Sequence, residues 1–150
     1  MEIKVMDKVL AANDAWADEN RKLLAEKKIL MLNLIGSPGA GKTTLLEKTI
    51  EAFKDKVQIG VIEGDIATTR DAERIQKAGA PVFQINTGNA CHLDANLVNA
   101  ALKEILKEND QIRLIFVENI GNLVCPAEFD IGEAAKIGVL SVAEGDDKVE

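Results

Sequence analysis

Residues 29–43 read ILMLNLIGSPGAGKT, and this stretch decides the fold of the chain. Its first seven residues form an apolar run with the length of a buried strand. The run leads into a glycine-rich loop over 36–43 and then into a periodic pattern that predicts a helix over 43–53. This is the full strand–GxxxxGK(S/T)–helix pattern of a phosphate-binding loop. The sequence therefore predicts a nucleotide-binding P-loop domain.

The loop contains the residue types that a polyphosphate requires. Glycines let the backbone approach phosphate oxygens, and the N–H groups at the start of the following helix face the anion. We expect Lys42 to reach the β- and γ-oxygens and to act in catalysis, and Thr43 to give its hydroxyl to Mg²⁺. The expected nucleotide contacts are Gly36, Ser37, Pro38, Gly39, Ala40, Gly41, Lys42, Thr43, Thr44 and Gly121.

Strands and helices alternate along the rest of the chain. The patterns predict strands over 57–63, 82–85, 114–118 and 137–142, and helices over 71–78 and 93–106. Gly79 is expected to end the first of these helices in a left-handed conformation. An amphipathic helix over about 7–27, with Asp7 as its N-cap, precedes the fold and is expected to pack on it. We therefore predict a single α/β domain over 1–150, a mostly parallel sheet with helices on both faces and ligands at the strand ends.

Composition excludes several classes of partner. The chain has 150 residues, a formal net charge of -7 and 3% aromatic residues. Such a chain fits neither the phosphate-driven affinity nor the base stacking of nucleic-acid binders, and its charge disfavours anionic membranes. No apolar run approaches the roughly 20 residues of a membrane span, and the N-terminus lacks a signal-peptide pattern. We expect a cytoplasmic protein with no nucleic-acid or membrane partner.

Acidic residues follow the predicted strands, where a P-loop needs a metal-side acid. Glu118 ends the fourth strand three residues before Gly121, which suits a Mg²⁺ acid followed by a γ-phosphate sensor. Asp65 stands at the mouth of the second strand and is also predicted to lie near Mg²⁺. Asp71 opens the next helix, and its spacing fits a Mg²⁺ ligand and a helix N-cap equally well. Arg70 and Arg74 could neutralise phosphate charge, although the amphipathic pattern of the helix favours a solvated Arg74.

Two cysteines and the sole histidine also follow predicted strands. Cys91 and His92 come after the third strand and Cys125 after the fourth, so all three are expected at one edge of the sheet. Two thiolates and an imidazole suit Zn²⁺ or Ni²⁺ and leave one position open. Asp94 is placed to orient His92. The spacing alone is equally consistent with structural cysteines and a surface histidine.

Together these segments resemble one family, the hydrogenase nickel-incorporation GTPases called HypB. The resemblance covers the whole chain. It implies a P-loop NTPase of the signal-recognition-particle/MinD class that acts as a GTP-dependent metallochaperone. Besides the P-loop, it is carried by Glu63-Gly64-Asp65, Asp71-Ala72-Glu73-Arg74, Asn86-Thr87-Gly88, Cys91-His92-Leu93-Asp94-Ala95, the run 118–126 and Glu144-Gly145-Asp146-Asp147.

The resemblance also implies cofactors and partners. It implies a slow GTPase that dimerises when GTP is bound and that assists nickel insertion into nickel–iron hydrogenase. Asp71 and Glu118 become Mg²⁺-site acids, and Cys91, His92 and Cys125 become ligands of Ni²⁺ or Zn²⁺. The implied partners are a second copy of the chain, hydrogenase maturation factors and the hydrogenase large subunit.

Two features depart from the family pattern. The N-terminal cysteine motif or His-rich stretch of some members is missing, so metal storage is not expected. The guanine-reading Asn-Lys-x-Asp motif does not occur in 1–150, so the expectation of GTP rather than ATP follows from the resemblance alone. We expect a shortened G domain with an unpaired sheet edge. Two alternatives remain: a P-loop kinase with a structural Cys/His cluster, and a nucleotide-dependent dimerising switch without metal delivery.

Overall fold

The structure is a computed structural model that describes residues 2–64 and 69–144. Asp65 and residues 145–147, which the sequence analysis singled out, lie outside the described residues. Within them, helices and strands alternate as the sequence predicts. The elements are α1 (Glu2–Lys27), β1 (Leu30–Ile35), α2 (Lys42–Phe53), β2 (Ile59–Glu63), α3 (Arg70–Ala78), β3 (Val82–Gln84), α4 (Ala95–Glu108), β4 (Leu114–Glu118), α5 (Cys125–Glu128), β5 (Ala135–Gly138) and a short 3-10 turn (Val142–Glu144).

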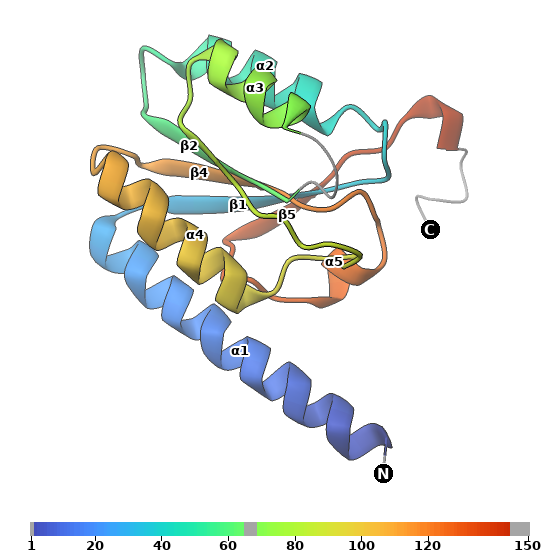
Figure 1. The fold of residues 1–150 in the computed structure, drawn as a ribbon. Coiled ribbons are helices and arrows are strands. Elements are labelled where there is room, and N and C mark those ends of the chain that lie inside the picture. The colour runs from blue at the N-terminus through green and yellow to red at the C-terminus, as the bar shows by residue number, and fades with distance from the viewer. Residues whose placement is uncertain (1, 65–68, 145–150) are drawn as a thin grey trace.

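The five strands form one parallel sheet in the order β3-β2-β4-β1-β5. Figure 1 shows α2 and α3 covering one face of the sheet and α4 with α1 covering the other. Parallel strands need crossover connections, and helices on both faces supply them. The predicted α/β class is confirmed. Because all strands run the same way, the loops that follow them gather at one edge of the sheet.

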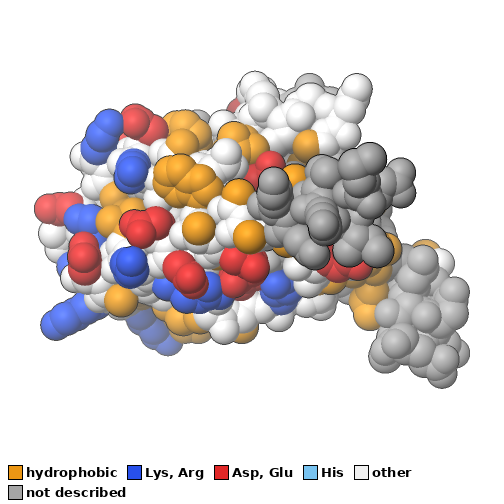
Figure 2. Space-filling model, turned by 90° about the horizontal axis from the view of Figure 1, so that it is seen from below, with side chains coloured by type: hydrophobic (Ala, Val, Ile, Leu, Met, Phe, Trp, Pro, Cys, Tyr) orange, Lys and Arg blue, Asp and Glu red, His pale blue; other side chains and the backbone are white. Residues whose placement is uncertain are grey.

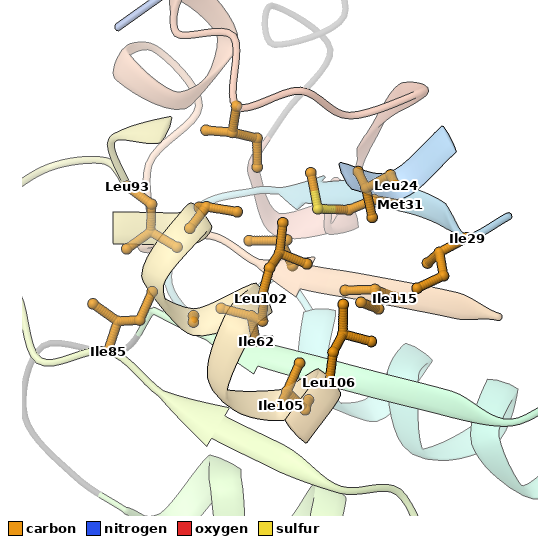
Figure 3. Packing of buried hydrophobic residues seen from close by; sticks show 14 of the residues in the cluster. Leu24, Ile29, Met31, Ile62, Ile85, Leu93, Leu102, Ile105, Leu106 and Ile115 are labelled. Atoms are coloured by element: carbon orange, nitrogen blue, oxygen red, sulfur yellow. The ribbon is translucent and has the colours of Figure 1, made fainter. Parts of the chain in front are cut away.

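Two apolar clusters fill the two interfaces between sheet and helices. Successive strand residues point to opposite faces, so Ile62 joins one cluster while its neighbour Val61 joins the other. The larger cluster lies under α4 and α1, where Leu102 and Ile105 meet Met31 and Ile115 (Figure 3). The smaller cluster packs α2 and α3 on the sheet. The three central strands β1, β2 and β4 are therefore largely buried on both sides and mostly apolar, while the edge strands β3 and β5 are more exposed.

Helix α1 packs along α4, as the amphipathic pattern predicts. The face of the molecule that these helices cover mixes hydrophobic and charged side chains (Figure 2). The predicted N-cap at Asp7 is wrong, because the helix already includes Glu2 and places Asp7 within it. No described helix combines the length and the apolar character that crossing a bilayer would require.

Other element boundaries differ from the predicted ones for local reasons. Gly79 caps α3 with φ 107°, as predicted, but Thr69 occupies the N-cap and places Asp71 in the first turn. The last strand is Ala135–Gly138 rather than 137–142, because its register with β1 ends at the pair Ile35–Gly138. Helix α5 was not predicted, since its four residues are too few for a periodic pattern.

Candidate functional site

The phosphate loop connects β1 to α2 and has the geometry of an anion cradle. Gly39 and Gly41 adopt φ values of 76° and 104°, which side-chain-bearing residues rarely adopt. These turns direct the chain into α2, which begins at Lys42. The Lys42 ammonium is buried and donates to the carbonyl oxygens of Gly36 at 2.9 Å and Ser37 at 3.2 Å. The ammonium is thereby held across the loop, where a phosphate would lie.

A cavity of about 450 Å³ opens beside this loop. Seven of the ten predicted nucleotide contacts line it: Pro38, Gly39, Gly41, Lys42, Thr43, Thr44 and Gly121. Gly36, Ser37 and Ala40 do not line it. Gly36 has a different constraint, because a Cβ there would lie 2.7 Å from the carbonyl oxygen of Val139. Gly121 lies against the loop, since its Cβ would meet Pro38 Cγ at 2.7 Å.

Three carboxylates meet at one side of the cavity. Oxygens of Glu63, Asp71 and Glu118 lie within 4.8 Å of one another, and Glu63 and Glu118 are opposite residues in the register of β2 and β4. The Thr43 hydroxyl donates to Glu118 Oε1 at 2.7 Å. Sequence reasoning placed Glu63 at a strand end but gave it no role. Its buried position beside Glu118 becomes visible only when β2 and β4 pair.

The carboxylate cluster fits a hard divalent cation. Burial raises the pKa of Glu118, and its contacts with Glu63 and the Thr43 hydroxyl oppose that rise. Glu118 Oε2 is buried and accepts no hydrogen bond. Several carboxylate oxygens beside a hydroxyl are the donor set that Mg²⁺ uses with phosphates. Which of these residues bind Mg²⁺ stays a prediction.

The structure differs from the prediction of a solvated Arg74, because neighbouring side chains bind its guanidinium. Its guanidinium forms an ion pair with Glu47, donates to the Thr44 hydroxyl at 3.1 Å and lies 3.6 Å from Asp71. It also lines the cavity. The residue thus adds a second positive charge, besides that of Lys42, to a cavity that also contains three carboxylates.

The cysteine and histidine side chains converge as the sequence predicts. Ligand atoms of Cys91, His92 and Cys125 lie within 4.8 Å of one another. His92 Nδ1 is 3.4 Å from Cys91 Sγ, while its Nε2 is 2.7 Å from Asp94 Oδ1, so Nδ1 is the nitrogen that faces the sulfur atoms. The His92 ring stacks on Phe129 with a centroid distance of 3.8 Å. Whether the three side chains bind a metal stays a prediction.

The Cys/His cluster is a reduced pair of thiols beside an oriented imidazole. Both cysteines are free, and the hydrogen bond with Cys125 is the main cause that raises the pKa of Cys91. A thiol that shares its proton with a neighbouring sulfur atom loses it less readily, and repulsion between two neighbouring thiolates acts in the same direction. A soft divalent cation would remove that repulsion and displace the protons.

Short connections join the two clusters. The segment that leaves β4 contains Glu118 of the carboxylate cluster and ends at Cys125 of the Cys/His cluster. Within it, the buried Asn119 accepts hydrogen bonds through Oδ1 from the backbone N–H groups of Leu93 and Ile120. Asn122 donates to the Cys91 carbonyl oxygen at 3.4 Å. These hydrogen bonds connect the segment that lines the phosphate cavity to the loop that carries Cys91.

Comparisons with known proteins agree with this geometry. A family model described as the CobW/HypB/UreG nucleotide-binding domain matches residues 30–144. Hydrogenase maturation factor HypB from Rhizobium leguminosarum bv. viciae is 51% identical over 146 residues, which are 97% of this chain and 48% of that relative. The probable hydrogenase maturation factor HypB from Methanocaldococcus jannaschii is 49% identical over 142 residues, which are 95% and 63% of the two chains.

Solved structures give the same result. The crystal structure of HypB from Helicobacter pylori in complex with nickel has a TM-score of 0.86 at 43% identity, covering 92% of this chain and 64% of that one. HypB from Archaeoglobus fulgidus has a TM-score of 0.82 at 41% identity, covering 93% and 67%. FtsY from Thermotoga maritima, at 16% identity and a TM-score of 0.54, shares the fold alone. The chain spans about half the length of the Rhizobium relative.

Proposed function

Because the chain belongs to the CobW/HypB/UreG family, in its HypB group, we propose that it binds and hydrolyses GTP and delivers nickel during hydrogenase maturation. One observation supports this proposal above all: a Cys/His cluster lies one short segment away from a P-loop cavity. The phosphoryl transfer of a kinase does not require a Cys/His cluster beside the phosphate loop. A metal carrier that must release its cargo on a nucleotide signal needs both.

The P-loop side supplies nucleotide binding and hydrolysis. Lys42 would contact the β- and γ-phosphates, and Thr43, Asp71 and Glu118, with Glu63 beside them, would hold Mg²⁺. A bound Mg²⁺ would neutralise charge that develops on the phosphates. Among the described residues that line the cavity, no glutamine is present to orient a water molecule, and the only arginine, Arg74, is held by carboxylates. We therefore propose slow intrinsic hydrolysis.

The other side would carry the nickel ion. Cys91, His92 and Cys125 offer two sulfur atoms and one nitrogen, and a fourth position stays open for a water molecule or a partner. Cys91 is exposed, so a second copy of the chain has access to the cluster. We propose that GTP promotes such a homodimer. Hydrogenase maturation factors and the hydrogenase large subunit are the proposed recipients, in the cytoplasm.

The two sides would be coupled through Asn119 and Asn122. If a γ-phosphate displaces Gly121, which lies against Pro38, the neighbouring hydrogen bonds to Leu93 and Cys91 change with it. Nucleotide state and metal affinity are then linked reciprocally.

A nickel titration tests the proposal. The chain is loaded with GDP or with a non-hydrolysable GTP analogue, and nickel binding is followed by thiolate-to-metal absorption. We expect stoichiometric binding whose affinity differs between the two states, and we expect ATP to compete poorly with GTP. Absence of a thiolate–nickel band in both states would overturn the metallochaperone proposal and leave a P-loop NTPase with a structural Cys/His cluster.

A further inference from the structure

Helix α1 contacts both loops that carry the Cys/His cluster. One loop, between β3 and α4, contains Cys91 and His92. The other, between β4 and β5, contains Cys125 and α5, and it lies close to the middle of α1 (Figure 1). None of the three proposed metal ligands comes from α1. The helix nevertheless bonds the backbone of both loops within a few residues of those ligands.

Asn13 joins the two loops with a single side chain. Its Oδ1 accepts the backbone N–H of Ala95 at 2.9 Å, and its Nδ2 donates to the carbonyl oxygen of Asp130 at 2.7 Å. One partner is a donor and the other an acceptor, so the amide has only one satisfactory orientation. Asn13 is 8% exposed, which means that the loss of either bond would leave a polar group without water.

The bond from Asn13 to Ala95 lies next to the residue that orients His92. Asp94 is the N-cap residue of α4, yet its side chain makes no capping bond and instead meets His92 Nε2 at 2.7 Å. Asn13 Oδ1 accepts the N–H of Ala95, which is the first N–H of α4 and one of the donors that have no partner within the helix. The start of α4 is thus bonded to α1, while the Asp94 carboxylate next to it faces the imidazole.

Further contacts with α1 fix the position of the second loop, between β4 and β5. Asn20, which is fully buried, donates to the carbonyl oxygens of Ala95 and Ile131, both at 2.9 Å. Gly132 has φ 91°, and a Cβ there would lie 2.7 Å from the Ala17 carbonyl oxygen. The loop thus approaches α1 as closely as a backbone can.

These contacts form a closed ring that includes His92 of the Cys/His cluster. From Asn13 it passes to Asp130, then to its neighbour Phe129, across the ring stack to His92, and through Asp94 back to Ala95 and Asn13. We propose that Asn13 is a positioning residue for the metal site, which sets the distance between the loop that carries His92 and the loop that carries Cys125. This inference rests on the proposed function, because it assigns Asn13 a role in the same nickel site.

The physical reason lies in the tolerance of a metal site. Ligand atoms must be held to within about 0.5 Å for a productive geometry, and loops seldom achieve this alone. Cys91 is exposed and lies in a loop, so it has little packing of its own. Helix α1, which packs along α4, supplies the rigid reference that both loops lack.

The test compares nickel binding by the wild-type chain with binding by Asn13→Ala and Asn13→Asp. Removal of a group that hydrogen-bonds or orients a metal ligand typically lowers metal affinity by about 10- to 100-fold. We expect both variants to lose about tenfold in nickel affinity and to shift the thiolate-to-nickel absorption band, which reports ligand geometry. Asn13→Asp keeps an acceptor for Ala95 but loses the donor to Asp130, so it tests the link between the loops if the alanine variant fails to fold.

Leu24→Ala is the matched control, because Leu24 is a buried core residue on the same helix that bonds neither loop. It should lower thermal stability while keeping the wild-type band and affinity. Unchanged affinity and spectrum in both Asn13 variants would overturn the inference, and so would an equal loss in Leu24→Ala. If the wild-type chain itself bound no nickel, the proposed function would fail and the inference with it.

Discussion

The two side-chain clusters at the carboxyl edge of the sheet are built in different ways. Glu63 and Glu118 end adjacent strands, are almost fully buried and face each other in a fixed register. Cys91, His92 and Cys125 lie in loops, and Cys91 is exposed. Two of the three members of the carboxylate cluster are therefore fixed by the pairing of strands, and only Asp71 comes from a helix. The Cys/His cluster depends on what holds its loops, and it can respond to a neighbouring site or to a partner.

This difference suits the proposed division of work. A phosphate site gains from preorganised charge that does not move during the reaction. A carrier site must bind its metal ion and later release it. Loops that adopt two conformations, of which only one binds the metal tightly, would allow this. Four substitutions test this comparison between the two clusters.

Lys42→Ala should have the largest effect and should act on the phosphate side alone. Removal of one preorganised donor to a developing charge typically costs about 10²- to 10³-fold in rate, and we expect at least that loss of GTP hydrolysis. Phosphate release in single-turnover assays measures it. Lys48→Ala, an exposed lysine on the same helix, should remain active. A Lys42→Ala variant that hydrolyses GTP normally would disprove the P-loop assignment.

Cys125→Ala should act on the metal side alone. We expect nickel affinity to fall by at least tenfold while nucleotide affinity stays near the wild-type value. Since Cys125 raises the pKa of Cys91, its removal should also lower that pKa and speed the alkylation of Cys91 at neutral pH. Nickel titration and iodoacetamide kinetics check the two outcomes. Equal nickel affinity in the variant would remove Cys125 from the site.

Glu118→Gln should separate function from stability. The pKa of Glu118 is raised by burial, so its ionised form costs stability above that raised pKa, and the cost is relieved as the pH falls through it. We expect the ligand-free variant to unfold at a higher temperature than the wild type at neutral pH, with the advantage vanishing in acid. Mg²⁺-dependent hydrolysis should fall about tenfold or more.

Thermal unfolding across pH measures the stability effect of Glu118→Gln, and hydrolysis against Mg²⁺ concentration measures the functional one. The control is Glu128→Gln, an exposed residue that should change neither. A variant that is less stable than the wild type at neutral pH would contradict the account of Glu118 as a carboxylate whose ionised form is destabilised by burial.

Arg21→Ala should give the smallest effect. Arg21 pairs with Asp130 through two contacts of 2.6 Å, but both side chains are partly exposed, so the pair contributes about 0.5 kcal/mol. Partial burial opposes ionisation of Asp130, yet the hydrogen bonds from Arg21 and the Gly132 amide outweigh it and lower its pKa. The stability difference should therefore be present at neutral pH and shrink in acid. Urea unfolding at pH 7 and pH 3 would measure it, and a larger difference in acid would contradict this account.

Several features could be predicted from local sequence because local physics decides them. The run 29–43 identifies the phosphate loop, since strand, glycines, Lys42 and helix are contiguous. Gly79 ends α3 because only a residue without Cβ adopts its φ easily. The parallel sheet followed from the alternation of apolar runs with amphipathic ones. Whether Asp71 is an N-cap or a first-turn residue could not be decided from the local sequence. The two positions differ by only two residues, and only the fold shows that Thr69 is the N-cap.

What the sequence by itself determined is the P-loop, the α/β class and the kinds of side chain at the ends of the strands, because each depends on neighbours along the chain. Only the tertiary structure decided which of these side chains meet. Glu63 joined the carboxylate cluster through the register of β2 with β4, and Asn13 reached Ala95 and Asp130, from which 82 and 117 residues separate it. Such contacts leave no periodic signal, since they arise from packing between elements rather than within one.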